Sequence, residues 1–380
     1  MFLISICAVS ALCILMFSNR IVIECPNGGV GFRGQLRLTT TQRAIILFGL
    51  VLILTSTVRY GFIDTYAYKE MYILSRNDLE YVNSAPWGVE AGWLYFLYLL
   101  NYISADPKLM LFVAALIING AYIFLCKEYS ADVKWSLFIY FCLFFLDTNN
   151  GIRQYAAAAI VMLLFPLLVK KKYIMYALGI WLAYQFHESA IVCAIIALVA
   201  SGSAFNIKTV AALGFGIFFI FNPNIGNELV ADVFVDSKYL FYLDMEVGAG
   251  MGIMRAIIVG IIPCAFAIMY LMNCRYSRRR ISREEGILLN VLFINTMFVL
   301  MGLYMQYWAR FSFYTYFAPV VLMPKLVYEV VGRENYANIK LLAILCYFFF
   351  FAYNVYVNIG YGAMEDFYID LPMFLETGGV

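Results

Sequence analysis

The stretch LMLFVAALIINGAYIFLC, residues 109–126, decides the fold class of this chain. It holds no charged side chain, and its length is close to the roughly 20 residues with which a helix crosses a bilayer. The sequence has eleven further apolar runs, and each of them is a candidate transmembrane helix. The sequence therefore predicts an all-α polytopic integral membrane protein with about twelve spans, including this one. The other runs lie at about 1–18, 42–58, 134–147, 152–169, 173–186, 188–202, 208–222, 255–273, 286–304, 311–328 and 338–357.

Composition supports this class. Of the 380 residues 64% are hydrophobic and 13% are charged, about half the charged share of a soluble domain. A water-soluble fold of this size has no means of hiding so much apolar surface. A soluble globular enzyme, a disordered chain, a collagen-like chain and a disulfide scaffold are thereby excluded. The nine cysteines form no CxxC motif and no cluster with histidine, so neither a metal site nor a disulfide framework is indicated.

The twelve runs suggest one membrane domain, residues 1–380. Run 1–18 has no basic residue before it and no small-residue cleavage pattern after it, so we interpret it as the first span and not as a signal peptide. A shorter run at 91–103 suits a re-entrant or interfacial helix. With the N-terminus outside, the outer segments are loops 59–107 and 222–254 and the acidic tail 358–380.

Basic residues agree with this sidedness. Only eight of the 26 lie outside, and the other 18 lie in inner loops, as cytoplasmic loops require. The densest inner segment is the loop 274–285, whose arginines we interpret as a topology anchor, with anionic lipid or nucleic acid as the alternative ligands. One long helix over 173–202 would place this loop outside, so two short helices meeting near His187 are expected. The eight outer basic residues are Arg59, Lys69, Arg76, Lys108, Arg153, Lys238, Arg255 and Arg310.

Polar residues at the outer ends of the spans are the candidate site, because ionisable groups at membrane depth are costly and mark functional positions. After the second span, Arg59 precedes Asp64, which is expected to cap a helix starting near Thr65, and Tyr68, expected in an interfacial aromatic belt. Glu90 opens the short run 91–103, where a helix dipole also favours an acid. The alternative to a functional role is a structural one, in which Arg59 extends its charged end to the membrane surface, Asp64 caps the helix and Tyr68 belongs to the aromatic belt.

Asn150 is expected to cap the helix that carries Arg153 and Gln154. A cation in the first helical turn needs a compensating anion, which a ligand phosphate would supply; an ion pair with Asp147 or Glu188 is the alternative.

His187, the only histidine, lies between two runs on the same side and is the side chain best suited to general-base work near neutral pH, although a lone histidine is more often structural. Arg310 and Tyr314 lie in an aromatic segment, where snorkelling or cation–π stacking also explains an arginine. Three arginines on one side, Arg59, Arg153 and Arg310, predict an anionic ligand, because guanidinium groups match phosphate oxygens.

The motifs Arg59-x4-Asp64-Thr-x2-Tyr68, Glu90-x-Gly92, Asn150-x2-Arg153-Gln154 and His187-x-Ser-Ala resemble the EpsG family, which includes Wzy-type polymerases of O-antigen, capsule and exopolysaccharide. The resemblance covers roughly residues 1–330. It implies a multi-pass glycosyltransferase of the bacterial inner membrane with a GT-C-like plan and a site facing the periplasm. It also implies transfer of a growing glycan from undecaprenyl diphosphate onto a lipid-linked repeat unit.

On this reading Arg59, Arg153 and Arg310 hold the diphosphate, and His187, Asp64 or Glu90 accepts the proton of the acceptor hydroxyl. Asn150, Gln154, Tyr68 and Tyr314 support the substrate. No metal ion and no cofactor is expected. The expected partners are undecaprenyl-diphosphate-linked oligosaccharide, membrane lipid and a chain-length regulator and flippase of the same pathway, with no nucleic acid. A lipid-linked oligosaccharide flippase, a polysaccharide acyltransferase and a non-catalytic assembly subunit are the alternatives.

Overall fold

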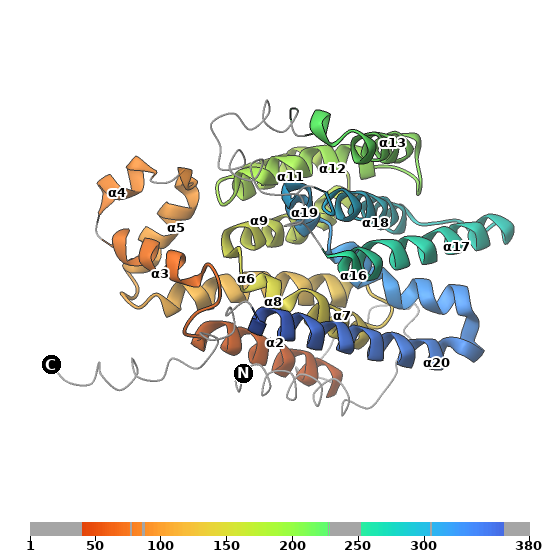
Figure 1. Ribbon diagram of the computed structural model, residues 1–380, viewed down its shortest axis with the longest axis horizontal. Helices are drawn as coiled ribbons and strands as arrows, with labels where there is room; N and C mark the ends of the chain where they lie inside the picture. Colours follow the sequence, from red (N-terminus) through yellow and green to blue (C-terminus); the bar gives the residue numbers. More distant parts are fainter. Residues whose placement is uncertain are drawn as a thin grey trace, which may run out of the picture. The chain divides into compact units, whose positions relative to one another are not determined.

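The computed structural model describes residues 40–76, 78–85, 88–226, 228, 252–304 and 306–360. These residues form helices joined by turns, with no β-strand among them, which confirms the all-α class (Figure 1). Run 1–18, most of the outer loop 222–254 and most of the tail 358–380 lie outside the described residues.

Every apolar run within the described residues is helical over most of its length. Phe144 breaks the run 134–147, and Leu164, just before Pro166, breaks the run 152–169. Gly332, whose φ is 75°, interrupts α20 between the runs 311–328 and 338–357. The helices of the first half are α2 (Thr40–Val58), α3 (Thr65–Leu74), α4 (Leu79–Ser84), α5 (Ala91–Asn101), α6 (Lys108–Tyr129), α7 (Val133–Leu143), α8 (Phe145–Thr148), α9 (Ile152–Leu163), α10 (Phe165–Val169) and α11 (Tyr173–Tyr184). Those of the second half are η2 (Glu188–Ile191), α12 (Val192–Ala200), α13 (Ile207–Phe221), α16 (Ile253–Arg255), η3 (Ala256–Ile261), α17 (Ile262–Tyr276), α18 (Arg283–Met301), α19 (Gln306–Phe311), η4 (Ser312–Tyr314) and α20 (Phe317–Gly360).

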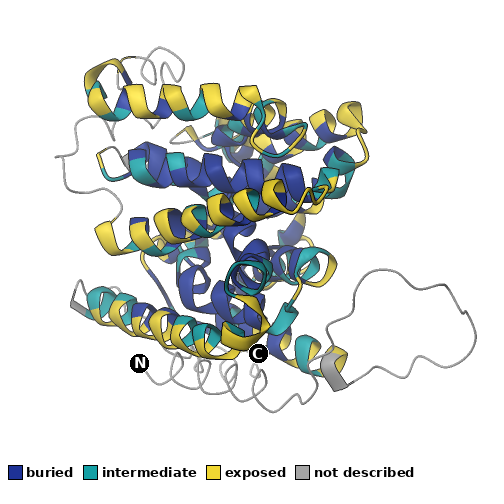
Figure 2. Ribbon diagram, turned by 90° about the vertical axis from the view of Figure 1, so that its right-hand side faces the viewer, coloured by how far each residue is buried: buried dark blue, intermediate teal, exposed yellow. Residues whose placement is uncertain are grey.

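Several of these helices suit a membrane. Five are long and apolar enough to cross one, and five more are apolar but shorter; both sets come from the described residues alone. Large apolar side chains lie exposed on the outward faces, such as Leu50, Trp181 and Phe349, while the opposite faces are buried (Figure 2). Exposed leucine and phenylalanine are stable against lipid and not against water. These helices are those of a multi-pass membrane protein, while the number twelve and the sidedness stay predictions. The five long helices are Lys108–Tyr129, Ile152–Val169, Ile253–Tyr276, Arg283–Met301 and Phe317–Ile359.

The chain divides into two compact units that alternate along the sequence. Unit 1 comprises residues 1–78, 97–152 and 341–380. Within it α2 packs along α6, and α6 meets α7 through Tyr122 and Tyr140, whose ring centroids stack 4.0 Å apart. The Tyr140 hydroxyl donates to Asn119 Oδ1 over 2.9 Å. Asn119 thus takes part in a hydrogen bond between two helices.

Unit 2 comprises residues 79–96 and 153–340. Its centre is α18, which contacts α12, α13, η3 and α19 and is buried over most of its length. Asn295 of α18 donates to the carbonyl of Val259 over 3.0 Å and accepts from the Thr315 hydroxyl over 3.0 Å. The NH2 group and the carbonyl oxygen of the Asn295 side chain thus both form hydrogen bonds inside the unit, as expected for a buried polar side chain in a membrane bundle.

The segment around His187 confirms the prediction of two short helices. Helix α11 ends at Tyr184, and η2 begins at Glu188 and continues as α12. His187 lies between them in an extended conformation, with φ −159° and ψ 123°, so a continuous helix over 173–202 does not form.

Candidate functional site

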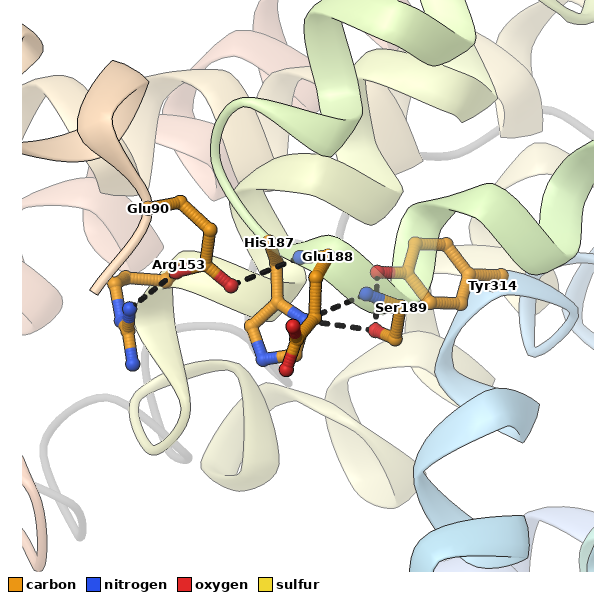
Figure 3. Close-up of polar contacts among 6 residues, drawn as sticks. All are labelled: Glu90, Arg153, His187, Glu188, Ser189 and Tyr314. Atoms are coloured by element: carbon orange, nitrogen blue, oxygen red, sulfur yellow. Dashed lines mark hydrogen bonds and ion pairs between the residues drawn. The ribbon is translucent and has the colours of Figure 1, made fainter. Parts of the chain in front are cut away.

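An ion pair between Glu90 and Arg153 opens the polar site of unit 2 (Figure 3). Arg153 Nη1 lies 2.5 Å from Glu90 Oε2, and both side chains are about nine-tenths buried. The second oxygen, Oε1, accepts the backbone N–H of Glu188 over 2.8 Å. The compensating anion expected for Arg153 is therefore present within the chain. Glu90 supplies it, because the start of α5 lies beside the first turn of α9.

Gly92 explains how Glu90 reaches this position. The backbone N–H of Trp93 donates to the carbonyl of Gln185 over 3.0 Å, which ties α5 to the end of α11. A β-carbon on Gly92 would lie 2.4 Å from Cβ and 2.6 Å from the carbonyl oxygen of Gln185. Only glycine permits this approach, so the Glu90-x-Gly92 motif has a steric cause.

Substituting Gly92→Ala is expected to lower the stability of the protein by about 1–3 kcal/mol, because backbone atoms would have to move apart. Thermal unfolding of the purified protein in detergent measures this loss. Gly120→Ala is the matched control, since a β-carbon there meets nothing within 4 Å. Equal melting temperatures for the two variants would contradict the close approach.

A second set of polar side chains surrounds Ser189. Ser189 Oγ lies 2.7 Å from His187 Nδ1, 2.8 Å from the Tyr314 hydroxyl and 3.1 Å from Gln154 Nε2, which donates to it. All four side chains are buried. We call this set the Ser189 network; Figure 3 shows three of its members beside the Glu90–Arg153 pair. Glu188 joins the two sets, because its N–H binds Glu90 while its neighbours His187 and Ser189 belong to the network.

The network determines which ring nitrogen of His187 carries the proton. The backbone N–H of Ser189 points at Nδ1 over 3.3 Å, and an N–H group acts only as a donor. Nδ1 of the neutral ring is therefore an acceptor, and the proton is assigned to Nε2. In this state Nε2 carries an N–H group, which is a donor. For a base acting through Nε2, the ring would first have to exchange tautomers.

Arg310 reaches the same network through its backbone. Gln154 Nε2, which donates to Ser189, also donates to the carbonyl of Arg310 over 3.1 Å. Arg310 is the fifth residue of the short helix α19 and is partly buried. Sequence reasoning selected Arg153, Gln154, His187, Arg310 and Tyr314 from three separate segments, and they occur together in one unit with Glu90.

Arg59 belongs to unit 1 and is 2% exposed. Its guanidinium donates to the carbonyl of Ser56, to the carbonyl of Asn149 over 3.2 Å and to the hydroxyl of Thr65 over 3.4 Å. Among the described residues it has no carboxylate partner. Burial lowers the pKa of Arg59 to about 9, so the group stays protonated at neutral pH. Within the described residues, Arg59 joins the end of α2, the start of α3 and the turn before α9.

Replacing Arg59 by lysine is expected to lower stability by about 1–3 kcal/mol, because lysine keeps the charge but a single ammonium group cannot span three acceptors. The melting temperature in detergent measures the effect. Lys69→Arg, at a partly buried site in the same segment, is the control. An Arg59→Lys variant as stable as the wild type would show that the three contacts are dispensable.

Asp64 and Asn150 differ from expectation as helix caps. Helix α3 begins at Thr65 as predicted, but Asp64 has helical angles, φ −75° and ψ −2°, and its side chain makes no capping bond. A capping residue needs an extended backbone. Asn150 is separated from α9 by Gly151, whose φ is 58°, so it does not cap that helix. Its buried Oδ1 accepts no hydrogen bond from the described residues.

The tyrosines of α3 divide between two environments. Tyr66 is exposed, as an interfacial belt requires, but Tyr68 and Tyr72 are buried in unit 1. The Tyr72 hydroxyl donates to the carbonyl of Ser104 over 2.6 Å. The interfacial position expected for Tyr68 is therefore wrong, since α3 packs against the chain after α5. A substrate contact by Tyr68 stays a prediction.

Sequence reasoning did not foresee the contacts of three contributors to the site. Ser189 is the central acceptor of the network, Gln185 supplies the carbonyl against which Gly92 packs, and Glu188 contributes its backbone N–H. The available signal was that Ser189 follows His187 by two residues, because a side chain can accept a hydrogen bond from the backbone N–H two residues later. Among the described residues no three His, Cys, Asp or Glu side chains form a group able to hold a metal ion.

An all-α membrane protein that buries an arginine–glutamate pair beside a histidine network is the class that fold and site define. Within that class, the chain belongs to the EpsG family, which it matches over residues 43–368. This membership implies a role in polysaccharide biosynthesis. No curated protein and no solved structure matches the chain.

Proposed function

We propose that this protein is a polysaccharide polymerase of the Wzy type, a metal-independent glycosyltransferase. It would transfer a growing glycan from undecaprenyl diphosphate to a lipid-linked repeat unit at the outer face of the inner membrane. The observation that supports the proposal is the Ser189 network, which connects the His187 ring, the Arg310 backbone and, through Glu188, the Arg153 ion pair within unit 2. Family membership supplies the pathway.

The leaving group of this reaction is a diphosphate, whose charge grows as the glycosidic bond breaks. Arg153 and Arg310 are the proposed cations, since guanidinium groups bind phosphate oxygens with paired hydrogen bonds. Arg153 is positioned by Glu90, so its orientation is set before the ligand arrives. Arg59 is fully engaged within unit 1, and we assign it to positioning the segment that carries Asp64.

The proton of the acceptor hydroxyl needs a destination. Glu90 already accepts two hydrogen bonds, and His187 Nδ1 accepts from Ser189. Asp64 is exposed and makes no side-chain hydrogen bond among the described residues. We therefore propose Asp64 as the proton acceptor and His187 as a hydrogen-bond donor through Nε2 to a glycan or phosphate oxygen. Asn150, with its unsatisfied buried oxygen, is a candidate partner for a sugar hydroxyl.

Deleting the gene is expected to abolish the polysaccharide ladder while one repeat unit stays attached at the cell surface. Extracted polysaccharide separated on a gel measures this, with the wild-type gene and Asp64→Asn as complements. Asp64→Asn keeps size and loses basicity, so we expect a reduction of about 100-fold or more in polymer. Complete loss of surface repeat units in the deletion strain would instead indicate a transport step, and a normal ladder with Asp64→Asn would remove Asp64 as the base.

A further inference from the structure

A cavity separate from the site above lies in unit 2, between the α12–α13 turn and the end of α17. Its volume is about 630 Å³, within the range of small-molecule pockets. Its walls come from the turn at Gly202–Ala204, the last turns of α17 and the connection to α18. Four arginines line it: Arg275, Arg278, Arg279 and Arg283.

The charge of this cavity is largely uncompensated. None of its lining residues is acidic. Arg279 pairs with Glu329 over 2.7 Å, but Arg283 donates to neutral acceptors, the carbonyl of Val169 and the hydroxyl of Tyr173. Among the described residues, Arg275 and Arg278 form no ion pair. The nearby Glu285 is buried and bonds instead to Lys325 and Tyr270. Three guanidinium groups therefore face one cavity without an acid.

One of these arginines, Arg278, has an unfavourable backbone conformation. Its φ is 54°, a left-handed conformation that favours glycine. Arg278 follows the end of α17 by two residues, and the N–H of the next residue, Arg279, donates to the carbonyl of Cys274 over 2.9 Å and closes the final turn. Glycine is the usual residue at this position of such a turn. An arginine there indicates a requirement for its guanidinium, since strained positions that persist are often functional.

We propose that this cavity binds a phosphate-bearing anion through Arg275, Arg278 and Arg283. The paired N–H groups of arginine match phosphate oxygens. A dianion bound in the cavity would neutralise the positive charge that no carboxylate compensates. A topology anchor needs positive charge in the loop but neither a cavity nor a strained arginine. Two sources share this chemistry, the headgroup of an anionic phospholipid and a soluble phosphorylated molecule. The inference is independent of the polymerase proposal.

Binding of inorganic pyrophosphate to the full-length protein in detergent, measured by calorimetric titration, tests the proposal. We expect the double variant Arg275→Gln/Arg278→Gln to weaken binding by about tenfold or more. Arg280→Gln is the matched control, because Arg280 is exposed in the same basic run but does not line the cavity. No pyrophosphate binding, or an equal loss in Arg280→Gln, would overturn the proposal in favour of diffuse positive charge.

Nanodiscs distinguish the two sources. The same titration is made in discs of phosphatidylcholine alone and in discs that also contain phosphatidylglycerol. If a lipid headgroup occupies the site, phosphatidylglycerol competes with pyrophosphate, and pyrophosphate binds more weakly in the second discs. The double variant would not show this difference between the discs. Equal binding in both discs would support the site with a soluble phosphate as its occupant.

Arg278→Gly separates a binding defect from a folding defect. Glycine relieves the left-handed strain, so we expect a melting temperature at or above that of the wild type, together with weaker pyrophosphate binding. A variant that is as stable as the wild type and still binds pyrophosphate as tightly would overturn the assignment.

Discussion

Replacing His187 by alanine is expected to reduce polymer formation by about 100- to 1,000-fold, whereas replacement by glutamine retains a substantial part of it. Removal of a single donor from a developing anion typically costs a factor of this size. Glutamine places an amide N–H near the position of Nε2 but has no basic nitrogen. The difference between the two variants therefore reports whether His187 donates a hydrogen bond or accepts a proton.

This expectation follows from the tautomer that Ser189 imposes. The Ser189 N–H and hydroxyl both address Nδ1, so the ring presents Nε2–H. Transfer from a purified lipid-linked repeat unit, measured as product per unit time, compares the variants. Tyr314→Phe is the control within the network, because it removes one hydroxyl and keeps the ring; we expect a loss of about tenfold or less. Equal, severe losses for glutamine and alanine would favour His187 as the base.

Replacing Glu90 by glutamine is expected to destabilise the protein by about 3–5 kcal/mol, the cost of leaving a buried charge without its partner. The charge left behind belongs to Arg153, which is 12% exposed and lies in the first turn of α9, where the helix dipole opposes a cation. Arg153→Gln should cost less, because Glu90 would keep the N–H of Glu188 and a favourable position near the start of a helix.

A double-mutant cycle measures this coupling by thermal unfolding in detergent. The double variant Glu90→Gln/Arg153→Gln should be more stable than Glu90→Gln alone. Pyrophosphate should raise the melting temperature of Glu90→Gln more than that of the wild type, because the anion takes the place of the lost carboxylate. Additive single effects would show that the pair is not coupled, and the absence of the extra pyrophosphate effect would count against diphosphate binding by Arg153. Arg280→Gln provides a charge-matched reference outside the site.

The class of the protein was determined by the sequence alone. Apolar runs such as 109–126 specify helices wherever lipid is the solvent, because backbone groups there must be satisfied within one segment. The break at His187 and the helix start at Thr65 were also visible, since both depend on neighbouring residues. Local chemistry determines such features, and it can be read without knowledge of the rest of the chain.

The partners of the site residues were decided by the tertiary structure. Arg153 needed an anion, but nothing in the sequence indicated that Glu90, 63 residues away, would supply it. Asp64 and Asn150 are residue types that cap helices, yet the helical backbone of Asp64 prevented capping and Gly151 separates Asn150 from α9. The proton position on His187 likewise depends on the geometry of Ser189. Residue types indicate which contacts are possible, whereas the packing of distant helices selects the contacts that form, because burial makes each unpaired polar group costly.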